Sequence, residues 1–207
     1  MKPSEIETLS FQIIDAEAGE HAFTPEEWQI VRRMIHTSAD FEYMQSIRFH
    51  PQAISAGIQA IRTGKTIFTD TQMARSGIRK TEIRHFGGRV ECLITDETVT
   101  AMAAKSGTTR ALAAVEAAVD EMEGGIYVVG NAPTALLKLI ELIRLHQARP
   151  ALVIGLPVGF VNAAESKAEL VTMDYPWISN VGRKGGSNLA AAVVNALSIM
   201  AIQTNGS

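Results

Sequence analysis

The chain has 207 residues, of which 46% are hydrophobic and 20% are charged, and its formal net charge is −3. These values are typical of a globular protein with one substantial core, and the lack of a basic excess disfavours nucleic acid as a partner. The basic residues are unevenly divided, because 12 are arginine and 7 are lysine. The planar guanidinium suits carboxylate and phosphate groups, so a small acidic ligand stays open.

Cysteine use and hydropathy exclude further classes. The single cysteine, Cys92, rules out an intrachain disulfide and a CxxC site, and we expect it to be a small buried residue. The N-terminus lacks an apolar signal core, and the longest apolar tract, residues 189–202, is shorter than the roughly 20 residues of a membrane span. No HExxH motif or Cys/His cluster predicts a metal site. We therefore expect a cytoplasmic protein that contacts no membrane.

The chain before about residue 65 is expected to be helical. In FTPEEWQIVRRMI, Thr24, Pro25 and Glu27 form a capping box with proline at the first helical position, which predicts a helix over residues 24–36. A second helix is expected from about Pro51 to Gly64. We expect this segment to pack on the sheet that follows.

Short apolar runs alternate with longer helical patterns after that segment. The expected strands are residues 65–70, 89–95, 125–131, 151–157 and 176–181. The expected helices lie near residues 97–105, 108–123, 132–147, 161–171 and 186–203. This alternation predicts an α/β fold, a doubly wound and mainly parallel sheet of five strands, which is a flavodoxin-like count. We expect one domain over residues 1–207.

Such a sheet binds its ligand outside the carboxyl ends of the strands. The segments leaving those ends are residues 69–73, 130–136, 155–167 and 180–188. Asn131 is expected to be either a helix cap or a ligand contact, and Asp70 either a ligand contact or a turn residue. The triplet from Glu165 to Lys167 could contact a ligand, but it fits a solvated first helical turn equally well.

Two stretches offer an anion-binding arrangement. In NVGRKGGSNLAAAVV, Ser187 is a candidate N-cap, and Arg183 and Lys184 flank the start of a long helix that could hold an anionic group. An ordinary glycine-rich turn explains the same residues equally well. Arg110 sits in the first turn of another helix, against the helix dipole, so either an anionic ligand or a surface salt bridge would account for it.

His36 is the residue whose side-chain chemistry best suits a catalytic role. On a helical wheel, Trp28, Val31 and Ile35 form the buried stripe, and His36 lies on the other side with Arg32 and Arg33. One reading is a solvated histidine near a helix C-terminus, where a cation is mildly favoured. The other is an acid/base group beside guanidinium anchors, since histidine titrates near neutral pH.

Five motifs along nearly the whole chain decide between these readings. They are LSFQIIDAEA, VRRMIH, GNAPTALLKLIE, GLPVGFVNAAESK and GRKGGSNLAAAVVNAL. Together they resemble the precorrin-8X methylmutase family, which includes the cobalt-precorrin-8 methylmutases of corrin biosynthesis. The resemblance puts His36 in the place of the catalytic histidine, and Ser10 and Arg33 at substrate-contact positions. It carries no role over to residues 37–43.

The resemblance also implies a fold, an activity and partners. Members are flavodoxin-like homodimers without a separate cofactor, and they move a methyl group from C-11 to C-12 of an anionic tetrapyrrole. Such a substrate makes Arg110, Asn131, Arg183 and Ser187 further candidate contacts. A non-catalytic corrinoid carrier and a flavin-binding module are the alternatives, and the presence of cobalt in the substrate stays open, as does the role of Arg32.

Overall fold

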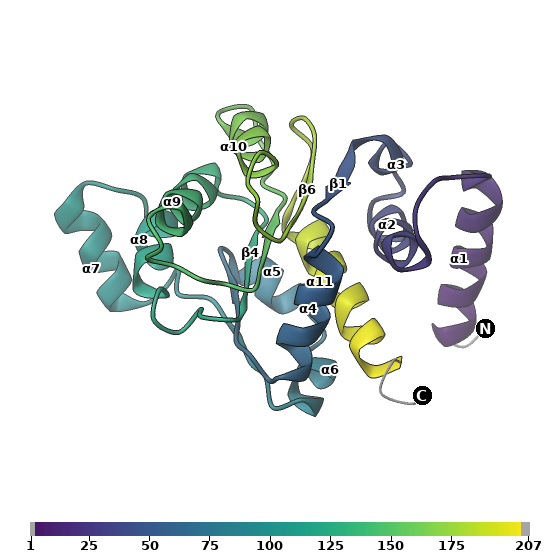
Figure 1. The fold of residues 1–207 in the computed structure, drawn as a ribbon, viewed down its shortest axis with the longest axis horizontal. Helices are drawn as coiled ribbons and strands as arrows, with labels where there is room; N and C mark the ends of the chain where they lie inside the picture. The colour runs from purple at the N-terminus through teal and green to yellow at the C-terminus, as the bar shows by residue number, and fades with distance from the viewer. Residues whose placement is uncertain (1–2, 204–207) are drawn as a thin grey trace.

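A six-stranded sheet forms the centre of the molecule in a computed structural model, which describes residues 3–203 (Figure 1). Its strands are β1 (Ile47–Phe49), β2 (Ile67–Thr69), β3 (Val90–Glu91), β4 (Ile126–Val129), β5 (Leu152–Gly155) and β6 (Trp177–Asn180). They lie in the order β1-β6-β5-β4-β2-β3. The five strands β2 to β6 are parallel and fall within the five runs expected from the sequence. The protein therefore has a mixed α/β fold with a mostly parallel sheet.

The sixth strand corrects the expected count of five. β1 pairs antiparallel with β6, with Arg48 opposite Ser179, and it lies inside the segment expected to be all helical. A run of three residues is too short to display a period of two, so β1 leaves no readable pattern. Its alternation of buried Ile47, exposed Arg48 and half-buried Phe49 becomes meaningful only once β6 lies beside it.

Helices cover both faces of the sheet. They are α1 (Pro3–Ala18), α2 (Pro25–Ser38), α3 (Tyr43–Ser46), α4 (Ala53–Arg62), α5 (Gln72–Gly77), α6 (Lys80–His85), α7 (Glu97–Ser106), α8 (Arg110–Ala117), α9 (Pro133–Arg144), α10 (Ala163–Leu170) and α11 (Ser187–Gln203). All residues of β4 and β5 are buried, as expected for strands covered on both sides. Successive residues of β4 enter different cores: Val128 packs with α2, α4 and α11, and Tyr127 packs with α8 and α9.

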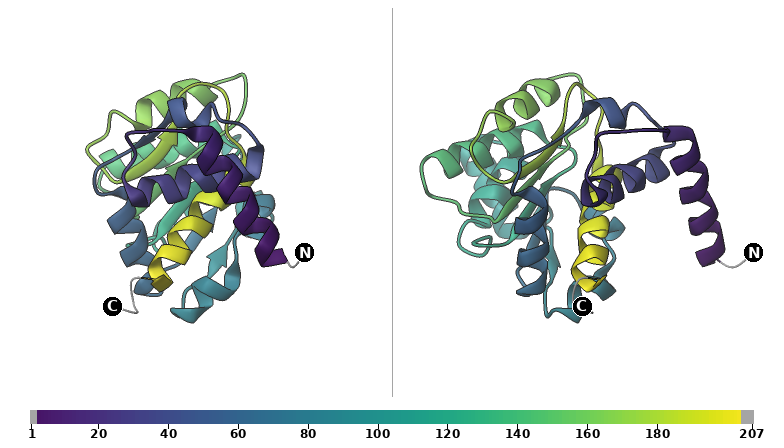
Figure 2. Two further views of the ribbon diagram at one scale, coloured as in Figure 1. Left: turned by 90° about the vertical axis from the view of Figure 1, so that its right-hand side faces the viewer. Right: turned by 45° about the vertical axis from the view of Figure 1, so that its right-hand side comes forward.

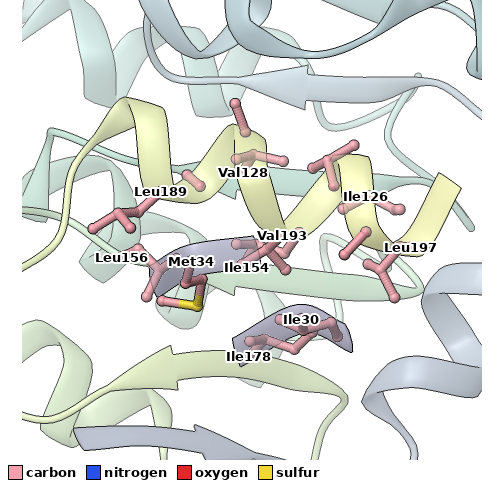
Figure 3. Packing of buried hydrophobic residues seen from close by; sticks show 14 of the residues in the cluster. Ile30, Met34, Ile126, Val128, Ile154, Leu156, Ile178, Leu189, Val193 and Leu197 are labelled. Atoms are coloured by element: carbon pink, nitrogen blue, oxygen red, sulfur yellow. The ribbon is translucent and has the colours of Figure 1, made fainter. Parts of the chain in front are cut away.

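The core on the α11 side places α2. Leu189, Val193 and Leu197 of α11 lie over Ile126, Val128 and Ile154 of the sheet (Figure 3). Ile30 and Met34 of α2 join the same cluster and are fully buried. α2 is therefore held against α11 by burial of its apolar stripe, which leaves its opposite face available for polar groups.

The N-terminal helices follow the expected pattern only in part. The capping box of α2 is present, since Thr24 Oγ1 accepts from Glu27 N at 3.2 Å and Glu27 Oε2 accepts from Thr24 N at 2.9 Å. α1, however, packs on α2 and stands away from the sheet (Figure 2). Over the described part of the chain, no helix has the length and apolar character needed to cross a bilayer.

Asp70 joins two neighbouring strand ends. It directly follows β2, is 1% exposed, and its carboxylate accepts the backbone N–H groups of Gly130, Asn131 and Ala132 at 2.8–2.9 Å. Burial raises the pKa of this carboxyl despite the three donors that stabilise its charge. Asp70 therefore holds the β4–α9 turn in place through buried hydrogen bonds. It is neither a solvent-exposed turn residue nor an accessible ligand group.

Replacing Asp70 by asparagine should lower the free energy of unfolding by about 1–3 kcal/mol. The amide keeps one acceptor oxygen and turns an NH₂ group towards at least one of the three backbone donors, leaving that donor buried and unpaired. Urea unfolding of the variant measures the loss. The matched control is Asp120→Asn at an exposed site. Equal stability of the two variants would contradict the role of Asp70 in holding the β4–α9 turn.

Candidate active site

His36 lies on the exposed face of the last turn of α2, beside the aromatic ring of Phe11 from α1. The two ring centroids are 5.3 Å apart with an interplanar angle of 66°. The guanidinium carbons of Arg32 and Arg33 lie 4.5 Å and 5.2 Å from the centroid of the same ring. The polar face expected from the helical wheel is confirmed. The electron-rich face of the Phe11 ring attracts both guanidinium groups, and the imidazole of His36 packs against the same ring.

Carboxylates of α1 pair with both arginines. Arg33 Nη1 lies 3.0 Å from Glu7 Oε1, and Arg32 Nη1 lies 2.8 Å from Asp15 Oδ2. Asp15 also accepts the indole N–H of Trp28 at 2.9 Å. The sequence left the role of Arg32 open. In the structure, its ion pair with Asp15 holds α1 against α2. An anionic ligand at Arg33 would have to share it with Glu7 or displace Glu7.

A hollow of about 400 Å³ opens beside His36. Ser10, Ile13 and Glu17 line it from α1, and Ile35, His36 and Phe41 line it from α2 and the segment beyond. We call this the His36 hollow. Ser10 is half-buried in it and its hydroxyl donates to Ile6 O at 2.8 Å. The structure therefore brings Ser10 and His36 together, whereas Arg33 lines a separate small hollow beside Phe11 and α11.

A second group of predicted residues lies at the carboxyl ends of the strands. Ser187 is 7% exposed, and its Oγ lies 2.7 Å from Oγ1 of Thr71. The expectation that it is an N-cap is wrong: Gly186 O accepts from Ala190 N, so Gly186 caps the helix and Ser187 is its first residue. A Cβ on Gly130 would lie 2.6 Å from Ser187 Cα, so this close approach requires glycine.

The structure disfavours the cap interpretation of Asn131 and the anion-binding interpretation of the glycine-rich turn before α11. Ala132 occupies the N-cap position of α9, so Asn131 is not a cap, and it is exposed at the end of β4. The N–H group of Gly186 donates to Leu156 O at 2.9 Å, so it is not free for an anion. The ligand-contact reading of Asn131 is the one that stays a prediction.

The two basic residues before the glycines have different partners. Lys184 Nζ is bound by Asp40, at 2.5 Å from Oδ2, and by Glu42. These contacts hold the pKa of Asp40 below its usual value, chiefly through the hydrogen bond from Lys184. Arg183 lies over the ring of Phe160, with its guanidinium carbon 5.5 Å from the centroid, and has no carboxylate partner within residues 3–203.

Arg110 stands apart from the other predicted residues. It is the exposed first residue of α8, directly after the N-cap Thr109. The surface salt bridge that would explain its position is absent over residues 3–203. Arg110 also lines neither the His36 hollow nor the hollow beside Phe11. The anionic-ligand reading of Arg110 therefore stays a prediction.

Lys167 is a buried cation that sequence reasoning missed. The expectation of a solvated triplet is wrong, because Ser166 is 0% and Lys167 is 1% exposed. Lys167 Nζ donates to Asn180 Oδ1 at 3.1 Å and to Lys184 O at 2.5 Å, so it supports the loop between β6 and α11 from below. Burial lowers the pKa of Lys167 to about 8. A polar triplet at a helix start gives no signal of such burial.

The lowered pKa of Lys167 predicts a pH dependence of stability. The folded protein holds this proton less firmly than the unfolded chain does, so stability should rise as the pH goes from about 8 to about 10.5. Relative to Lys167→Met, the gain should be about 1–3 kcal/mol. Urea unfolding across this range measures it, with Lys105→Met on the surface of α7 as the control. A stability difference that stays constant with pH would contradict the prediction.

The remaining sequence expectations concern metals and the thiol. Within residues 3–203, no three His, Cys, Asp or Glu side chains lie close enough together to hold a metal ion. Cys92 is half-buried just after β3, and burial raises the pKa of its thiol. A thiol that is harder to ionise is a poorer nucleophile, which agrees with a packing role.

Comparison with known proteins gives consistent matches over nearly the whole chain. The family described as precorrin-8X methylmutase matches residues 5–200. The cobalt-precorrin-8 methylmutase of Priestia megaterium is 51% identical over 201 residues, 97% of this chain and 89% of that protein. The precorrin-8X methylmutase of Pseudomonas aeruginosa is 38% identical over 191 residues, 91% of each chain.

A solved structure extends the likeness to three dimensions. The crystal structure of precorrin-8X methyl mutase from Thermus thermophilus has 47% sequence identity to this chain and a TM-score of 0.92. The match covers 99% of this chain and 98% of that one. The sequence likeness and the fold likeness therefore span the same residues, including both groups of candidate site residues.

Proposed function

Because the chain belongs to the precorrin-8X methylmutase family, an isomerase family, we propose that it moves a methyl group from C-11 to C-12 of precorrin-8X or cobalt-precorrin-8. The product is hydrogenobyrinate or its cobalt counterpart, cobyrinate. The observation that carries the proposal is the exposed His36, which lines a hollow of about 400 Å³ and shares the ring of Phe11 with Arg32 and Arg33. The cobalt form and the metal-free form are both candidate substrates.

His36 supplies the proton chemistry of the proposed reaction. Protonation of a ring nitrogen makes the macrocycle more electron-poor, which assists a 1,5-sigmatropic shift of the methyl group. His36 donates this proton and takes it back after the shift, so the reaction needs no net oxidation, reduction or hydrolysis. Acid assistance of this kind contributes typically about 10²–10⁴-fold to a rate.

The polycarboxylate substrate gives the other candidate residues their proposed roles. Arg33 is the anchor nearest His36, and binding there exchanges Glu7 for a substrate carboxylate. Ser10 shares the His36 hollow, and Arg110, Asn131 and Arg183 are exposed on loops and helix starts. Ser187 has the least support as a contact, because its hydroxyl already lies against Thr71.

Replacing His36 by alanine should lower kcat by about 10²–10⁴-fold with little loss of binding, because a proton donor is removed and the hollow stays open. Conversion is followed through the absorption spectrum with precorrin-8X and with its cobalt complex. His85→Ala, at an exposed site on α6, serves as the control.

The same measurements separate the alternative functions. A corrinoid carrier would bind the macrocycle without converting it, and the His36 substitution would then change nothing measurable in turnover. A flavin-binding module would take up FMN and show yellow absorbance. Wild-type protein that binds the substrate and leaves its spectrum unchanged would refute the proposed isomerase activity.

A homodimer accounts for an apolar stripe on α1. Ile6, Leu9 and Ile13 are 52%, 43% and 50% exposed, and their spacing places them on one side of the helix. Exposed apolar surface on a helix that packs mainly against its neighbour α2 favours a protein partner. Because Ile13 also lines the His36 hollow, a second copy seated here would border the site.

Replacing Leu9 by aspartate should therefore convert a dimer into a monomer, since an unpaired carboxylate would be buried at the interface. Sedimentation velocity gives the oligomeric state of the variant and the wild type. The control is Met102→Asp at a comparably exposed position of α7, 39% exposed. A wild-type protein that sediments as a monomer would refute the dimer.

Four further expectations stay proposals. The parallel strands follow the order β3-β2-β4-β5-β6, which is the flavodoxin-like order, so we treat the sheet as that arrangement extended by β1. The family match over residues 5–200 supports a single domain. A cytoplasmic location and activity without a separate cofactor are expected from the family resemblance.

A further inference from the structure

Arg48 is an exposed cation that the proposed function has not yet used. It lies in the middle of the edge strand β1, opposite Ser179 of β6. Its Nη1 donates to Gln45 O and to Ile47 O, each at 2.7 Å. The guanidinium is therefore held by its own backbone, while Nε and Nη2 have no carboxylate partner within residues 3–203. Such a group is oriented in advance for an anionic ligand.

Arg48 and Arg183 line the same hollow of about 370 Å³ between α3 and the β6–α11 loop. We call this the arginine hollow. Glu42 also lines it, but Glu42 is bound to Lys184, which pairs with Asp40 as well. The other ionic groups of this hollow are thus paired with each other. Two guanidinium groups without described carboxylate partners remain, which is the chemistry that receives one carboxylate.

Shared lining residues connect the arginine hollow to His36. A larger hollow of about 730 Å³ lies between the two and is lined in part by Phe23, Met44 and Phe49. It shares Glu17 and Phe41 with the His36 hollow. It shares Gln45 and Arg48 with the arginine hollow. We call these three adjoining hollows the depression. Aromatic side chains line its middle together with the polar Glu17, Glu27 and Gln45, and His36 lies at one end and Arg183 at the other.

We propose that Arg48 and Arg183 together bind one carboxylate side chain of the substrate, at the end of the depression opposite His36. This inference rests on the proposed function, because it takes a large, flat polycarboxylate as the ligand. The aromatic side chains in the middle of the depression offer flat surfaces to the macrocycle, and the paired guanidiniums suit an acidic group on its rim. The antiparallel pairing of β1 with β6 fixes Arg48 relative to the loop that carries Arg183.

The test compares Arg48→Gln, Arg183→Gln and the double variant with wild type. Each single variant should raise KM by about tenfold or more, as expected for loss of a charge-assisted contact, while kcat changes much less. Because both arginines hold one group, the double variant should be weaker than wild type by less than the product of the two single effects. Arg48→Lys should recover only part of the loss, since an ammonium lacks the fork.

Binding of the polycarboxylate product, hydrogenobyrinic acid, gives a readout that needs no turnover. Its Kd should rise in parallel with KM. Arg144→Gln, in the last turn of α9, removes a positive charge on another surface and should change neither value. The proposed function fails if wild type binds this compound but converts no substrate, and Arg48 is then judged on Kd alone. A Kd of Arg48→Gln equal to that of Arg144→Gln, or fully multiplicative effects in the double variant, would overturn the shared carboxylate site.

Discussion

The burial of α11 between α2 and the sheet is the interaction on which the positions of the other groups depend. α11 is apolar nearly all round, and most of its residues from Leu189 to Ala201 are buried against the sheet, α2, α4 and α5. α2 reaches the body of the molecule largely through this helix, so the hydrophobic contact that stabilises the fold also sets where His36 stands. A catalytic group carried by a rigid helix is located more closely than one carried by a loop.

A second, polar layer of contacts refines this placement. Glu7 and Asp15 of α1 each take one arginine of α2, and Phe11 lies among both guanidiniums and the His36 ring. Each exposed ion pair on its own contributes little to stability. Together they fix the angle at which α1 crosses α2 and therefore the shape of the His36 hollow. The same layer leaves the apolar stripe of α1 facing outward.

Features determined by local sequence could be predicted, and features determined by distant neighbours could not. The capping box at Thr24, the apolar runs of β4 and β5 and the solvent side of α2 are local patterns, and the structure confirms them. β1 forms because β6 offers it an edge to pair with. Lys167 can be buried because Asn180 Oδ1 and the carbonyl oxygen of Lys184 accept hydrogen bonds from its ammonium group. The grouping of Ser10 with His36 likewise depends on how two helices cross. Whole-chain motifs identified those two residues, where helical periodicity alone identified only one.

The pairing of Arg33 with Glu7 has a consequence for selectivity. Glu7 occupies the Arg33 guanidinium before any ligand arrives. The protein itself thus neutralises this charge, so other anions are attracted to it less strongly. Under the role proposed for Arg33, ligand binding exchanges one carboxylate for another, and the net gain is small compared with the gross strength of either contact. A macrocycle without an acidic group at that position would leave Glu7 in place and its own edge unsatisfied. The site would thus discriminate through the exchange it demands rather than through tight grip.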